Sequence, residues 1–261
     1  MSDMTGQPQR AAGIDSITGF QVLGPFGSGT CLMFNYMQQL YAVPGSYDGC
    51  CWKHSLPPRY RTVVNRRSRP FKPDFDAWRT VQFIVMARSP YYWISSLLER
   101  AYEVDFDTPS RKRRDRLFSA LSIHGRSFPH VMALWNAYYR AYPRWLVPRA
   151  PVRTVRLEDL VADPRRVLEG LGRLPRDESV DRDALIDRID ATPAKVHGEA
   201  CVAGDEARAR YTEANVPRYF APDELEFIND GLDPELLRRL GYRRIEPDPS
   251  RIWTTPAIGA A

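Results

Sequence analysis

Residues 22–37 read Val-Leu-Gly-Pro-Phe-Gly-Ser-Gly-Thr-Cys-Leu-Met-Phe-Asn-Tyr-Met. A short apolar run meets a glycine-rich turn, and an apolar segment follows, so the stretch predicts a strand, a loop and a helix. Glycines let such a loop aim its N–H groups at an anion, and the helix N-terminus adds partial positive charge. Gly24 and Gly29 have Walker A spacing, but Thr30 follows directly, without the lysine of that motif. We therefore predict a phosphate-binding loop that does not serve ordinary ATP or GTP hydrolysis.

Strand and helix signals alternate over residues 20–171, which predicts an α/β fold. Its 261 residues and 43% hydrophobic content suffice for one domain with a substantial core, or for two small ones. We expect one, because no Gly/Ser linker divides the chain. The expected parts are a polar leader at 1–15, a domain at 16–245 and a tail at 246–261.

Periodicity and turn residues predict the individual elements. A continuous apolar run at 80–87 indicates a central parallel strand that is buried on both faces. Residues 57–73 are rich in Pro and Arg and predict a loop or arm, and the polar stretch 176–218 predicts a lid. The other expected elements are a strand ending at 22–23, helices at 30–40, 90–102, 114–123 and 128–142, a strand at 152–155, a turn and helix at 157–171, and two short helices at 221–241.

The net charge of +5 is mild but unevenly placed. Two segments carry most of the excess: Arg59, Arg61, Arg66, Arg67, Arg69 and Lys72 in one, and Arg111, Lys112, Arg113, Arg114 and Arg116 in the other. They fit solvated loops, or contact with an anionic cofactor or substrate. We do not expect nucleic acid as a partner, because the chain shows no zinc spacing, no aromatic RNA-binding signature and no clear recognition helix.

The expected compartment is the cytoplasm of a bacterium. The four cysteines, Cys31, Cys50, Cys51 and Cys201, form no C-x-x-C motif, so buried reduced thiols are the simpler interpretation. The N-terminus has no apolar signal core, and no apolar run approaches the roughly 18 residues of a membrane span. Only 4 of the 37 basic residues are lysine, which hints at a GC-rich genome.

A second motif follows the buried strand. Arg88, Ser89 and Pro90 come directly after it, and Ser96 lies eight residues beyond the arginine. Ligands of open α/β sheets bind at the carboxyl edge, where this strand delivers Arg88. An arginine and a hydroxyl at that edge can bind a second phosphate. Taken alone, a helix-capping arginine and an ordinary serine would be the simpler interpretation.

Together, the two motifs resemble the PAPS-dependent sulfotransferase family. Residues 27–30, Gly-Ser-Gly-Thr, stand where that family has its 5′-phosphosulfate loop, usually Lys-Ser-Gly-Thr. Arg88-Ser89-Pro90 with Ser96 is similar to its 3′-phosphate motif. Residues 154–160 resemble a later Arg-Tyr-Glu-Asp-Leu block, and the ending at 220–242 is similar to many family C-termini. The resemblance covers roughly residues 18–243.

The resemblance implies a three-layer α/β/α domain around a five-stranded parallel sheet with a P-loop-like phosphate site. It implies sulfuryl transfer from PAPS to a hydroxyl, or an amine, with PAP as product and no metal. The acceptor we expect is a small molecule of secondary metabolism; neither nucleic acid nor a membrane is expected as a partner, and a homodimer is left open. The implied cofactor-binding residues are Gly27, Ser28, Gly29, Thr30 and Cys31 for the 5′-phosphate, and Arg88 and Ser96 for the 3′-phosphate. Arg210, with Arg208 and Tyr211, is a lid candidate for the 3′-phosphate or adenine, although no motif fixes these three residues.

The chain departs from the family at Gly27, where the loop lysine usually stands. That lysine would stabilise charge on the bridging oxygen as the S–O bond breaks. Residues 52–58, Trp-Lys-His-Ser-Leu-Pro-Pro, resemble the family's Lys-Thr-His-Leu-Pro segment, whose histidine is the general base. We therefore assign His54 as base and Lys53 as the replacement for the missing lysine. A surface Lys-His pair before a proline turn is the structural alternative.

Other acid-base candidates rank lower. His124 is the reserve base, although its place at an expected helix end favours a structural role. Glu99 and Glu158 are not chosen, because the first is expected to face solvent and the second belongs to a block whose implied role is structural. Two other functions stay open: a P-loop kinase-like phosphotransferase, and a nucleotide-binding protein that has lost its chemistry.

Overall fold

The computed structural model describes most residues of the chain. These are residues 17–43, 45–46, 51–64, 67–100, 104–171, 174, 177–191, 195–196, 199–200 and 220–247. The expected leader, most of the expected tail, and Arg208, Arg210 and Tyr211 of the expected lid lie outside these residues.

A parallel sheet forms the centre of the fold, with its strands in the order β2-β1-β5-β9. β1 spans Gly19–Leu23, β5 spans Val81–Ala87 and β9 spans Val152–Arg156, while β2 is the two-residue strand Gly45–Ser46. The predicted strands at 22–23, 80–87 and 152–155 are confirmed. The described residues contain these four parallel strands and no fifth one in the same sheet, so the five-stranded count is not confirmed.

Both faces of the sheet are buried, as the apolar run of β5 predicts. Phe83, Val85 and Ala87 face one hydrophobic core, and Ile84 and Met86 face the other. This alternation follows from the period of two in a strand, and it explains why the run shows no polar positions at its centre. The described part of the chain is therefore a mixed α/β structure with helices on both faces of a parallel sheet.

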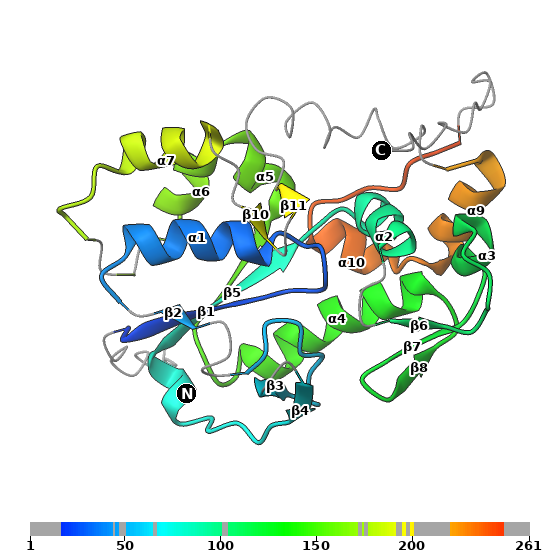
Figure 1. The fold of residues 1–261 in the computed structure, drawn as a ribbon, viewed down its shortest axis with the longest axis horizontal. Coiled ribbons are helices and arrows are strands. Elements are labelled where there is room, and N and C mark those ends of the chain that lie inside the picture. The colour runs from blue at the N-terminus through cyan, green and yellow to red at the C-terminus, as the bar shows by residue number, and fades with distance from the viewer. Residues whose placement is uncertain are drawn as a thin grey trace, which may run out of the picture.

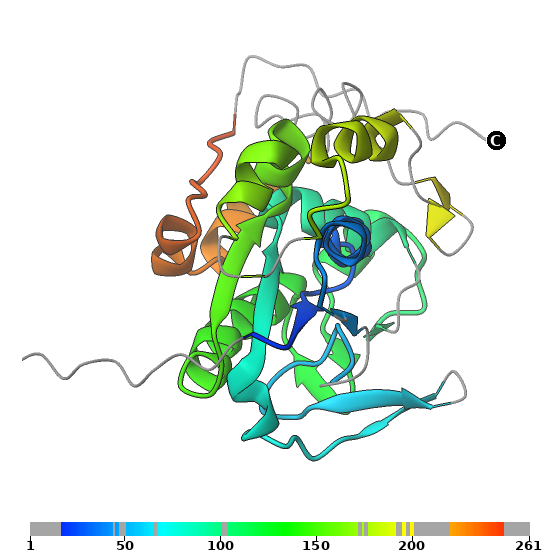
Figure 2. The same ribbon diagram turned by 90° about the vertical axis from the view of Figure 1, so that its left-hand side faces the viewer.

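The helices divide between the two cores. In Figure 1, α1, α6 and α7 lie above the sheet and α4 lies below it, and Figure 2 gives the view turned by 90°. The core that contains Ile84 and Met86 receives side chains from α1 (Thr30–Leu40), α5 (Leu157–Ala162), α6 (Pro164–Glu169) and α7 (Arg182–Ala191). The core that contains Phe83, Val85 and Ala87 receives them from α2 (Pro90–Glu99), α3 (Arg113–Leu117), α4 (Val131–Leu146), α9 (Pro222–Gly231), α10 (Pro234–Arg239) and the 3₁₀ turn η1 (Ala77–Thr80).

Helix starts follow the local signals. Gly29 caps α1, and Pro90 opens α2 at its first turn. The Asp163 carboxylate accepts from the Arg166 N–H at 3.0 Å, which confirms the predicted helix start before Pro164. Among the described residues, no helix has the length and apolar character that crossing a membrane requires.

One predicted helix is wrong over half of its length. Residues 114–123 were expected to be helical, but α3 ends at Leu117 and β7 (Leu121–Ile123) follows. β7 pairs antiparallel with β6 (Asp105–Phe106) and β8 (Arg126–Phe128). The turn between β7 and β8 consists of His124 and Gly125, both with positive φ, which is the conformation of a tight hairpin turn.

The Pro- and Arg-rich segment at 57–73 is an arm with regular structure. Its centre forms an antiparallel hairpin of β3 (Arg61–Val64) and β4 (Arg67–Pro70). In the predicted lid, the structure describes α7 and the short pair β10 (Lys195–Val196) and β11 (Glu199–Ala200).

Candidate functional site

The glycine-rich loop between β1 and α1 is tightly folded. Gly27 and Gly29 have φ values of 69° and 86°, in the left-handed region that favours glycine. The backbone N–H and the hydroxyl of Ser28 both donate to the Pro25 carbonyl, at 3.2 and 2.7 Å. A Cβ added at Gly24 would lie 2.3 Å from the Ser28 Oγ, so this turn requires a residue without a side chain.

The start of α1 has the features of an anion site. Gly29 offers no side-chain cap, and the first bond into the helix runs from the Met33 N–H to the Gly29 carbonyl at 3.1 Å. The N–H groups of Thr30, Cys31 and Leu32 precede that bond, so they have no acceptor within the helix. These donors, with the helix dipole, suit a phosphate oxygen.

Lys53 and His54 dock directly on this loop. The Gly24 N–H donates to the Lys53 carbonyl at 2.9 Å, and His54 Nδ1 lies 2.8 Å from the Gly24 carbonyl oxygen. The Lys53 ammonium donates to Cys31 Sγ at 3.0 Å. Its positive charge therefore lies at the first turn of α1, beside the loop that lacks its own lysine.

The bond to Gly24 fixes the tautomer of His54. A carbonyl oxygen only accepts hydrogen bonds, so Nδ1 must carry the proton and, in the neutral ring, Nε2 holds the lone pair. The side chain is 7% exposed, and its ring packs against that of Phe26 at 4.2 Å between centroids. Tyr138 donates its hydroxyl to the His54 carbonyl at 3.0 Å, which holds the segment from the other side.

Arg88 brings the second motif to the same loop. It follows β5, the neighbour of β1, and its Nη1 donates to the Gly27 carbonyl at 2.7 Å. The residue is 7% exposed, and Trp135 donates to its carbonyl at 3.3 Å. Ser96 lies further along α2 and is half-buried. The structure thus brings Arg88, Lys53 and His54 together at the carboxyl edge of the sheet.

The acidic candidates have structural contacts. Glu158 follows β9 and accepts from the Ser89 N–H at 2.8 Å and from the Tyr242 hydroxyl at 2.9 Å. It therefore holds the start of α2 and the C-terminal segment against the sheet edge. Glu99 is exposed and accepts from Ser95 at 3.1 Å.

His124 occupies a place that the sequence did not indicate. It lies in the β7–β8 turn, and its ring stands 4.9 Å from that of Trp52, with an edge-on orientation. Burial, and then the charge of Arg61, lower the pKa of His124 to about 4, so the ring is neutral at pH 7. Trp52 also contacts the His54 ring, at 5.3 Å. We call this group the aromatic cluster: Phe26, Trp52, His54 and His124.

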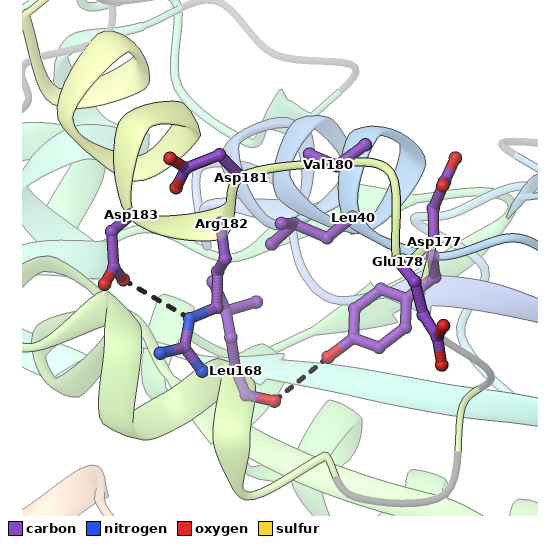
Figure 3. A pocket seen from close by; sticks show the side chains of 9 residues that line it. Leu40, Leu168, Asp177, Glu178, Val180, Asp181, Arg182 and Asp183 are labelled. Carbon is purple, nitrogen blue, oxygen red and sulfur yellow. Dashed lines mark hydrogen bonds and ion pairs between the residues drawn. The ribbon is translucent and has the colours of Figure 1, made fainter.

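Two hollows lie elsewhere on the described surface. The first, of about 320 Å³, is lined in part by the acidic residues Asp177, Glu178, Asp181 and Asp183. Figure 3 shows Arg182 beside it, paired with Asp183 at 3.4 Å. The second, of about 750 Å³, lies between α4, β9 and α6. Neither is lined by the candidate residues of the glycine-rich loop or by Lys53, His54 or Arg88.

Comparison of the chain with protein-family models and with curated proteins finds no match. A function for the site has to be argued from its own geometry and from the motifs that the sequence carries.

The conformation of Gly29 allows a direct test of the loop. In Gly29→Ala, the new Cβ meets Leu157 Cδ1 at 2.6 Å and the residue keeps a positive φ, so we expect a loss of about 1–2 kcal/mol in unfolding free energy. Gly170→Ala is the matched control, because Gly170 has φ −66° and its added Cβ stays 3.4 Å from the nearest atom. Urea unfolding measures both. Equal stability of the two variants would contradict the left-handed loop.

Proposed function

We propose that this chain is a PAPS-dependent sulfotransferase that moves a sulfuryl group to the hydroxyl of a small molecule, with an amine as a second acceptor type. One observation carries the proposal: the Lys53–His54 segment and Arg88 both contact the glycine-rich loop. We infer further that the domain has the five-stranded, P-loop-like architecture that the resemblance implies. A metal-free reaction in the cytoplasm, on an acceptor of secondary metabolism, completes the proposal.

The residues present fit the two phosphate ends of PAPS. The N–H groups at Gly29, Thr30 and Cys31 suit the 5′-phosphate, because the start of α1 has no side-chain cap. The N–H of Ser28 is engaged by Pro25, so Ser28 shapes the loop together with Gly27. Arg88 and Ser96 would bind the 3′-phosphate, and a guanidinium matches phosphate oxygens well. Arg210 keeps its proposed role at the lid outside the described residues.

PAPS would supply the sulfuryl group, and the residues of this chain would move the proton and stabilise charge. His54 has its Nδ1–H on the Gly24 carbonyl, so Nε2 is the atom that would take the acceptor proton. Lys53 places its ammonium at Cys31, where it would stabilise negative charge on the departing phosphate. Lys53 thereby supplies the cation that Gly27 does not.

The two alternatives draw less support from the same contacts. A kinase-like phosphotransferase needs a lysine within the loop and a magnesium-binding aspartate at a strand end. Arg88, and no aspartate, follows strand β5, and the carboxylate after β9, Glu158, accepts from Ser89 and Tyr242. A protein without chemistry would have no need for a lysine and a histidine docked on the loop.

The nucleotide that the protein binds distinguishes a sulfotransferase from a kinase-like phosphotransferase. We expect PAP to raise the melting temperature by several degrees at saturation, because a ligand at about 100 times its Kd adds about 2.7 kcal/mol. ADP with magnesium should give a much smaller shift. Arg88→Met should lose most of the PAP effect, whereas Arg153→Met, at an exposed position of β9, should keep it. Stabilisation by ADP with magnesium and not by PAP would overturn the proposal.

Turnover with labelled PAPS tests the two catalytic assignments. With an acceptor that the wild type sulfates, His54→Asn should lower kcat about 10²–10⁴-fold while PAP still binds, because the asparagine amide takes the place of Nδ1 as donor to Gly24 but has no basic nitrogen. Lys53→Ala should lower kcat more than PAP affinity, and Lys53→Arg should recover part of it. Near-normal turnover of His54→Asn would refute the role of His54 as base, and an effect of Lys53→Ala on affinity alone would refute the role of Lys53.

A further inference from the structure

Two hairpins meet beside the Lys53–His54 segment. The β3–β4 hairpin begins at Arg61, whose carbonyl accepts from the Trp52 N–H at 2.5 Å and whose N–H donates to Ser55 Oγ at 3.0 Å. Just before it, Arg59 Nη1 donates at 3.3 Å to the carbonyl of Gly125, in the turn of the β7–β8 hairpin. Both hairpins lie in the lower part of Figure 1, and residues 52–55 are bonded to the first of them.

These hairpins place arginines close to one another. We call Arg59, Arg61 and Arg126 the arginine cluster. Burial, and then the charge of Arg59, lower the pKa of Arg126, while the charge of Arg61 acts on His124. Neither Arg59 nor Arg126 forms an ion pair with a carboxylate of the described residues, and Arg126 lies over the Phe128 ring at 5.4 Å. A bound anion would relieve the repulsion between Arg59 and Arg126, which have no such carboxylate among the described residues.

The arginine cluster is linked to His54, the proposed base, through Tyr138. Tyr138, whose hydroxyl donates to the His54 carbonyl, is also within electrostatic reach of Arg126. His124 stands between the hairpins and Trp52, in a turn with φ 52°. Its buried Nε2 has no hydrogen-bond partner among the described residues.

We propose that the acceptor is a hydroxylated aromatic compound with an anionic group, and that Arg59 and Arg126 bind this group. The inference rests on the proposed function, because it needs the acceptor hydroxyl to lie at His54. The aromatic cluster supplies ring surfaces for a planar molecule, and two guanidinium groups suit a carboxylate, sulfate or phosphate.

A matched pair of probes, one anionic and one neutral, tests whether the site prefers an acceptor with an anionic group. Binding of 4-hydroxyphenylacetate and of its neutral amide, 4-hydroxyphenylacetamide, is measured by calorimetry with and without saturating PAP. We expect the carboxylate to bind about tenfold more tightly than the amide. Arg126→Gln and Arg59→Gln should each remove most of that preference. Arg111→Gln, which loses the same charge at an exposed position of the other basic segment, should keep it.

The outcomes separate this inference from the proposed function. Equal binding of the two probes, no binding of the carboxylate, or an unchanged preference in both cluster variants would overturn the inference. Exclusion of the carboxylate by PAP, together with weaker PAP binding in Arg126→Gln, would also overturn it, because the cluster would then hold a nucleotide phosphate. A carboxylate preference that depends on Arg126, in a protein that binds no PAP, would support the anion site and refute the proposed nucleotide.

Discussion

The Gly24 peptide is the point on which the candidate site depends. Its N–H donates to the Lys53 carbonyl, and its carbonyl accepts from His54 Nδ1, so both polar groups of one glycine are satisfied by one dipeptide. Buried backbone groups are costly to leave unpaired, so these bonds fix the segment to the loop. They also fix the tautomer of His54 and bring the Lys53 ammonium to the start of α1. The contact between Gly24 and residues 53–54 therefore holds in place the groups proposed for phosphate binding, proton transfer and charge stabilisation.

The parallel sheet explains why the other groups arrive at the same place. β1, β5 and β9 are neighbours with the same direction, so the residues that follow them emerge at one edge. Arg88 follows β5 and reaches the loop after β1, while Glu158 follows β9 and binds the Ser89 N–H. Tyr242 then ties the C-terminal segment to Glu158. Each strand therefore contributes one fixed group to the edge, and tertiary contacts rather than loop flexibility set their positions.

Local patterns predicted much of this architecture. The helix at 30–40 and the strand at 80–87 were predicted closely, because a left-handed glycine, a continuous apolar run and a proline mark their ends. The contact of residues 53–54 with the loop followed only from the resemblance, since no periodicity links segments so far apart in the chain. The strand at 121–123 was missed because Leu-Ser-Ile also fits a helix, and only pairing with β6 and β8 decides it. That error also hid the place of His124 beside Trp52.

A crystal structure with PAP would show where the two phosphates bind. We expect the 5′-phosphate at the N–H groups of Gly29, Thr30 and Cys31, the 3′-phosphate within hydrogen-bond distance of Arg88 and Ser96, and Lys53 and His54 facing the 5′ end. A nucleotide bound away from the glycine-rich loop, or with its 3′-phosphate remote from Arg88, would contradict it.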